Sequence, residues 1–109
     1  MSIHLPAAID LYLRAENSGD VEVLADCFAP EATVRDEGSL HKGLAAIRRW
    51  KAETRKKYRH TVEPLESAVH GARTSVVVRL TGTFPGSPIT LHFDFELKEG
   101  KITSLEMHP

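Results

Sequence analysis

The apolar residues of this chain change their period once, near residue 60, and that change limits the fold more than any other feature. Before it, apolar residues recur every three or four positions, which is the spacing of an amphipathic helix. After it, they alternate with polar residues, as in a strand with one buried face. Helices followed by strands are typical of the α+β class. We therefore expect three N-terminal helices that cover one side of a curved antiparallel sheet.

Three helices and one strand are predicted before residue 60. Asp20 is a suitable N-cap for the second helix, and Pro30 follows soon after its end. In the strand, Val34 and Asp36 point to the same side, because side chains alternate along a strand. The third helix carries Trp50 on its apolar face. The predicted elements are a helix that ends at residue 19, a helix over 20–28, a strand over 32–36 and a helix over about 43–55.

Four strands are predicted from residue 60 on. The alternation is sharpest in the third of them, where apolar residues face one side and Thr90, His92, Asp94 and Glu96 face the other. One face of the sheet therefore packs in the core, and the other is exposed to solvent or covered by a partner. A Glu-Gly pair at 99–100 forms a tight hairpin turn. The predicted strands cover residues 60–70, 73–84, 89–97 and 101–108.

Size and charge restrict the function. At 109 residues, 41% of them hydrophobic, the chain suits one domain over residues 1–109 but has no room for a separate cofactor domain. A net charge of −1, from 14 basic and 15 acidic residues, argues against a nucleic acid or an anionic membrane as partner. Residues 1–17 lack the basic start and apolar run of a signal peptide, and no apolar run is long enough for a membrane span. We expect a cytoplasmic protein.

Cysteine and histidine do not indicate a metal site. Cys27 is the single cysteine and is interpreted as a small buried hydrophobe, and the six histidines lack the spacing of a tight metal site. His92, Asp94 and Glu96 share one strand face and could hold a divalent ion, although basic neighbours across the sheet or a dimer interface are commoner explanations. The basic run 48–59 places its aromatic residues on the core side, so it is interpreted as a solvated helix face. We expect no metal and no cofactor.

The segment 12–36 combines a phenol and a carboxylate that together could move a proton. Asp36 ends the first predicted strand, and Tyr12 lies on the apolar face of the first helix. A carboxylate in an apolar pocket is a competent base, and a phenol can stabilise an enolate. Each residue also has a structural alternative, since Tyr12 could fill the core and Asp36 could begin a turn. The helical spacing places Tyr12 on the same face as Leu5, Ile9, Leu13 and Glu16.

This segment, with NSGD at 17–20, the phrase HKGLAAIRRW at 41–50 and the strands that follow, resembles the nuclear transport factor 2-like superfamily, which includes SnoaL-like polyketide cyclases and ketosteroid isomerases. The resemblance implies a cone-shaped α+β barrel around one pocket. It implies that Tyr12 donates a hydrogen bond to the substrate oxygen and that Asp36 takes a proton from carbon. Leu91 stands where these isomerases carry a second, acidic donor, so an efficient steroid isomerase is not expected.

The same resemblance places Trp50 on the pocket wall, and the strand alternation adds apolar lining. His41 and His60 lie near predicted element ends, where they could reach the pocket mouth and relay a proton. We expect the apolar surroundings to raise the pKa of Asp36 by desolvation. The expected ligand is a small hydrophobic molecule. The residues predicted to bind it are Trp50, Val34, Val78, Leu91, Phe93 and His60.

Two functions stay open at this point. In the first, the chain is a small enzyme that binds a hydrophobic carbonyl compound and uses Asp36 as general base for isomerisation, cyclisation or dehydration. In the second, the same cone is a non-catalytic ligand-binding protein or a dimeric assembly module. A homodimer is expected in both, because sheets of this family usually pack back to back. The two functions are separated by whether Tyr12 and Asp36 converge on an open cavity.

Overall fold

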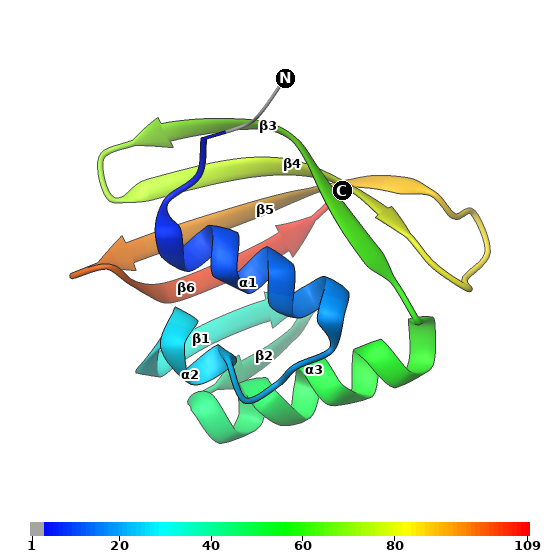
Figure 1. The fold of residues 1–109 in the computed structure, drawn as a ribbon, viewed down its shortest axis with the longest axis horizontal. Helices are drawn as coiled ribbons and strands as arrows, with labels where there is room; N and C mark the ends of the chain where they lie inside the picture. The colour runs from blue at the N-terminus through cyan, green and yellow to red at the C-terminus, as the bar shows by residue number, and fades with distance from the viewer. Residues whose placement is uncertain (1–3) are drawn as a thin grey trace.

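Three helices lie on one face of a curved six-stranded sheet (Figure 1). The computed structural model describes residues 4–109. The α+β class and the position of the helices confirm the prediction. In chain order the elements are α1 (Ala7–Ser18), α2 (Leu24–Cys27), β1 (Phe28–Asp36), β2 (Ser39–Lys42), α3 (Leu44–Tyr58), β3 (Thr61–His70), β4 (Arg73–Thr81), β5 (Ile89–Lys98) and β6 (Lys101–His108).

The sheet is mixed, not purely antiparallel as the sequence predicted. Its strand order is β2-β1-β6-β5-β4-β3. After the β1–β2 hairpin and α3, the chain enters the far edge of the sheet at β3 and returns strand by strand to β6. Strand β6 therefore arrives beside β1 in the same direction, and the two pair in parallel, with Val34 opposite Leu105. All the other neighbouring strands pair antiparallel.

Four boundaries differ from the predicted ones. Helix α2 has a single turn, because the Asp20 side chain accepts a hydrogen bond from the Glu22 backbone N–H at 3.0 Å and forms a turn there instead of capping a longer helix. Strand β1 begins at Phe28, inside the predicted second helix. Strand β2 was not predicted, and it pairs with β1 across a tight turn at 37–38. Helix α3 continues to Tyr58, and β4 ends at Thr81.

The inner face of the sheet forms the core with α1. The Tyr12 ring lies edge-on to Phe28 and Phe95, with centroid distances of 5.5 and 5.8 Å. On the outer face, Arg73 pairs with Glu96 at 2.8 Å, the basic neighbour that the sequence suggested for this acid. No helix within residues 4–109 has the length and apolar character that a membrane span requires.

Candidate functional site

A cavity of about 650 Å³ opens between α3 and the inner face of β4–β6. This volume falls within the range of small-molecule sites, and most of the wall is apolar. The apolar part comes from the sheet and from the β4–β5 connection, with Leu80, Phe84, Ile89, Leu91, Phe93 and Met107. The polar part comes mainly from the helical side and the end of β1, with Glu16, Asp36, Lys51 and His60. A ligand in this cavity would therefore meet charged groups on one side and hydrocarbon on the other.

Asp36 lies on the cavity wall because β1 ends there and turns into β2. The Trp50 indole Nε1–H donates a hydrogen bond to Asp36 Oδ2 at 3.0 Å. Burial raises the pKa of the Asp36 carboxyl, and the Trp50 hydrogen bond and the charge of Lys51 only partly oppose this effect. Within residues 4–109, Asp36 Oδ1 has no side-chain hydrogen-bond partner. One oxygen is thus held in place and the other is free to act as a base.

Trp50 is fixed by the groups around it. The His41 ring stacks on the indole with a centroid distance of 5.6 Å, and Lys51 Nζ lies 3.9 Å from the indole centroid. An ammonium above an aromatic face is attracted by the ring quadrupole. The same indole therefore orients Asp36 at its N–H and contacts a cation at its face.

A buried polar network borders the cavity next to Trp50. Glu16 Oε1 accepts hydrogen bonds from Lys51 Nζ and from His60 Nε2, each at 2.6 Å, and Glu16 Oε2 accepts one from the Tyr12 hydroxyl. Arg55 Nη1 donates to the backbone carbonyls of Glu16 and His60 at 2.6 and 2.8 Å. The side chains of Glu16, Lys51 and His60 are only 1%, 3% and 5% exposed. These groups form a buried network along one side of the cavity.

The network fixes the charges of its members. Burial alone would raise the pKa of Glu16, but Lys51 and His60 outweigh burial and hold that pKa at about 2. Burial lowers the pKa of Lys51, and Glu16 opposes this effect. Burial and the charge of Glu16 raise the pKa of Tyr12 well above its ordinary value of 10.0. Glu16 is therefore a carboxylate at neutral pH, paired with Lys51 at 2.6 Å, and Tyr12 keeps its proton.

The structure brings together five of the eight residues predicted for the site. Asp36, Trp50, Leu91, Phe93 and His60 all lie on the cavity wall.

The other three residues are behind that wall. Tyr12 is fully buried and its hydroxyl is directed to Glu16, one helical turn further along α1. Val34 and Val78 are also fully buried in the core. Tyr12 and Asp36 therefore do not converge on the cavity, because the Tyr12 hydroxyl donates its hydrogen bond to the buried carboxylate of Glu16.

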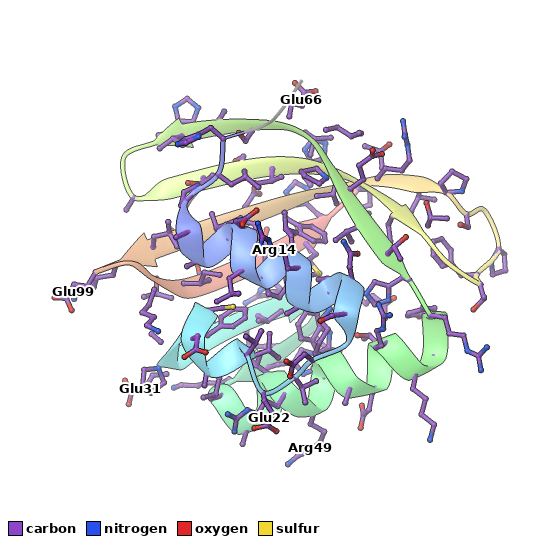
Figure 2. The ribbon with its side chains drawn as sticks, in the orientation of Figure 1. Arg14, Glu22, Glu31, Arg49, Glu66 and Glu99 are labelled. Carbon is purple, nitrogen blue, oxygen red and sulfur yellow. The ribbon has the colours of Figure 1, made fainter. Side chains whose placement is uncertain are left out.

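Sequence reasoning missed the roles of Glu16 and Lys51. Glu16 falls on the apolar face of α1, where an acid needs a buried donor or cation as partner. Lys51 was assigned to a solvated face, yet it follows the buried Ile47 by four residues and shares its side of α3. Arg49, two positions before Lys51, does point outward (Figure 2). The four-residue spacing was the signal that could have identified Lys51.

One group of side chains outside the network could hold a metal ion. Ligand atoms of Asp94, Glu106 and His108 lie within 4.8 Å of one another, and they do not include the predicted His92. His108 Nε2 contacts Asp94 Oδ2 at 2.6 Å, and Ser75 Oγ donates to Asp94 Oδ1 at 2.9 Å. Ser75 and His108 already satisfy the Asp94 carboxylate, so an ion is not needed to explain the arrangement of these three residues.

Comparison with known proteins links this geometry to a family. The profile of the SnoaL-like domain family matches residues 9–105. A protein provisionally assigned as a polyketide cyclase, from Sinorhizobium meliloti, is 41% identical over 95% of both chains, with a TM-score of 0.92. No curated protein matches the sequence significantly.

Two further solved structures share the fold. The epoxide hydrolase/cyclase-like enzyme SalBIII, which acts in pyran ring formation in the polyether salinomycin, is 25% identical; the alignment covers 93% of this chain and 86% of SalBIII, with a TM-score of 0.80. A hypothetical protein with a ketosteroid isomerase-like fold from Catenulispora acidiphila, crystallised with trimethylamine, is 19% identical over 97% of this chain and 87% of its own, with a TM-score of 0.86.

Proposed function

The chain belongs to the SnoaL-like domain family, and we propose that it binds an apolar carbonyl compound and transfers a proton at carbon with Asp36 as general base. The observation that carries this proposal is the position of Asp36. Its carboxylate lies on the wall of an apolar cavity, its pKa is raised by burial, and one of its oxygens is fixed by Trp50. A carboxylate in such surroundings is a stronger base than one in water.

The proton transfer requires no group beyond a base and an acceptor for negative charge. Asp36 takes a proton from the carbon next to a carbonyl, the C–H electron pair forms a C=C bond, and the carbonyl π pair moves to oxygen. In an isomerisation, Asp36 returns the same proton to another carbon of the conjugated system. In a cyclisation, the enolate carbon attacks a second carbonyl of the same molecule, and the resulting alkoxide takes the proton.

Cyclisation is the favoured outcome. The Sinorhizobium protein, provisionally assigned as a cyclase, is 41% identical to this chain, and SalBIII is cyclase-like. The apolar wall would hold the hydrocarbon part of a substrate in a folded form while its reacting carbons stay near Asp36. Tyr12 takes no part in this proposal, because its hydroxyl bonds to Glu16.

Proton exchange on a simple ketone tests the proposal. In D2O, NMR follows the loss of the α-proton signal of β-tetralone, an apolar bicyclic ketone. The wild-type protein should accelerate exchange. Asp36→Asn should lower the protein-dependent exchange rate roughly a hundredfold or more. Asp26→Asn makes the same change at an exposed position and should exchange like the wild type. Acceleration that survives in Asp36→Asn would exclude Asp36 as the base.

A non-catalytic binding function is favoured by one observation. The hydroxyl of Tyr12, which the family resemblance casts as the donor to the substrate oxygen, faces Glu16 and not the cavity. If no other group replaces that donor, the cavity would hold a ligand without converting it. Binding of β-tetralone with no acceleration of exchange would support this function.

A further inference from the structure

We propose that Lys51 is a further catalytic residue of this cavity, whose ammonium binds the carbonyl oxygen of the substrate as that oxygen becomes anionic. This inference rests on the proposed function, since it names the group that accepts the charge created when Asp36 removes a proton. It replaces the donor role that the family resemblance gave to Tyr12.

Lys51 has a hydrogen-bond donor that no group of the described residues uses. An ammonium group has three N–H donors. One Lys51 donor goes to Glu16 Oε1 at 2.6 Å, and the Trp50 ring lies beside the group at 3.9 Å from Nζ to its centroid. Within the described part of the chain, Lys51 Nζ has no second hydrogen-bond acceptor. The side chain is 3% exposed and lies on the cavity wall, so a ligand oxygen is the natural partner for the remaining donor.

Lys51 and the base, Asp36, lie on the same cavity wall and contact the same indole, that of Trp50. Asp36 Oδ2 lies at the edge of the Trp50 indole, and Lys51 Nζ lies over its face. A ketone in the cavity beside these two residues can therefore present its α-carbon to Asp36 and its oxygen to Lys51.

Lys51 is not the only partner of the Glu16 carboxylate. This carboxylate accepts hydrogen bonds from three side chains, those of Lys51, His60 and Tyr12. The Glu16 carboxylate is thus shared among three buried donors, and Arg55 contacts Glu16 only at its backbone carbonyl. A fixed cation in such surroundings stabilises a developing oxyanion more strongly than it would in water.

The arrangement also indicates the class of ligand. The cavity should prefer apolar molecules with an enolate or phenolate oxygen to neutral molecules of the same shape. Glu16 acts as a positioning residue because it holds Lys51 Nζ at 2.6 Å, and His60 holds Glu16 in turn.

Binding of para-nitrophenol tests this preference directly. Its phenolate absorbs visible light and its neutral form does not, so the spectrum reports which form is bound. Wild-type protein should bind the phenolate and should bind it roughly tenfold to hundredfold more tightly than para-nitroanisole, its uncharged methyl ether. Equal affinity for the two compounds, or binding of the neutral phenol, would overturn the proposal without the use of any variant.

Substitution then assigns the preference to Lys51. Lys51→Met should abolish the preference for phenolate, because it should weaken phenolate binding much more than para-nitroanisole binding. If burial of an unpaired Glu16 prevents this variant from folding, the double variant Glu16→Gln with Lys51→Met removes both charges and should show the same loss. A phenolate preference that survives in either variant would overturn the proposal, and so would an equal loss of affinity for both compounds, which indicates a purely structural role.

The outcome is separable from that of the proposed function. The binding test can be made in the Asp36→Asn background, where proton exchange is not expected. If phenolate binding depends on Lys51 but exchange does not depend on Asp36, only the proposed function fails. If exchange depends on Asp36 but phenolate binding ignores Lys51, only the role of Lys51 fails.

Discussion

Glu16 is the residue whose ionisation contributes most clearly to stability. Its pKa falls from 4.5 to about 2 on folding, so the folded state favours the carboxylate. The contribution is fully present above about pH 4.5 and is lost as the pH falls toward 2. A difference of this size corresponds to about 3 kcal/mol. Urea denaturation across this pH range should show a steeper loss of stability in the wild type than in Glu16→Gln.

The difference between the two proteins is the informative quantity, because other carboxylates also titrate in this range. The pKa of Asp94, for example, is lowered by His108 and Ser75 against the effect of burial. Equal slopes for wild type and Glu16→Gln would show that Glu16 gains nothing from its partners.

Asp36 should have the opposite effect on stability. Its pKa is raised from 3.8 by burial, so ionisation costs the folded state stability as the pH rises above 3.8. Asp36→Asn removes this cost and keeps an oxygen that can accept the Trp50 N–H. The variant should melt a few degrees above the wild type at neutral pH, with no difference below about pH 3.8. A lower melting temperature at neutral pH would mark Asp36 as a structural cap.

At the scale of the elements, Asn17 joins the end of α1 to the start of β3. Its Nδ2–H donates to the Val62 carbonyl at 3.1 Å, and its Oδ1 accepts from the Val62 N–H at 2.7 Å. Asn17→Ala loses both hydrogen bonds and should cost about 1–2 kcal/mol in denaturant unfolding. Arg14→Ala, which removes an exposed ion pair on the same helix, should cost less than about 1 kcal/mol. Equal costs would show that the bridge is dispensable.

The elements that the sequence predicted well are those with a long periodic pattern. Helices α1 and α3 and strands β4 and β5 bury their apolar residues at the expected spacing, whereas β3 buries Val62 and leaves Leu65 and Val69 exposed. Strand β2 has four residues, too few for a period. Its turn could have been recognised, because the Glu-Gly pairs at 37–38 and 99–100 adopt the same φ values of 52° and 78°. The parallel pairing of β1 with β6 joins distant segments, and no local pattern reveals it.

The residues on the cavity wall could be anticipated where one element fixes the side chain, and not where several side chains compete. Asp36 follows from the end of a strand and Trp50 from the face of a helix, and both reach the cavity. The direction of the Tyr12 hydroxyl depends on Glu16, which in turn depends on Lys51 and His60 from other elements. A network of this kind is fixed only when the tertiary structure assembles it.

At the scale of the whole molecule, we predict a homodimer formed through the outer face of the sheet. This face carries Thr90, His92, Asp94 and Glu96, which alternate with the buried Phe93 and Phe95. Light scattering should give twice the mass of the 12.1 kDa chain at micromolar concentration. His92→Glu would add a third acid beside Asp94 and Glu96 and should weaken the dimer. The mass of a single chain, unchanged by concentration, would contradict the prediction.

The pH dependence of β-tetralone exchange tests the role of Asp36 most directly, after the rate without protein is subtracted. In the wild type, the exchange rate should rise as Asp36 ionises, with a midpoint above pH 3.8, and should then level off. In Asp36→Asn this rise should be absent. A rate that follows only hydroxide concentration, or a profile that Asp36→Asn leaves unchanged, would contradict the claim that Asp36 is the base in this cavity.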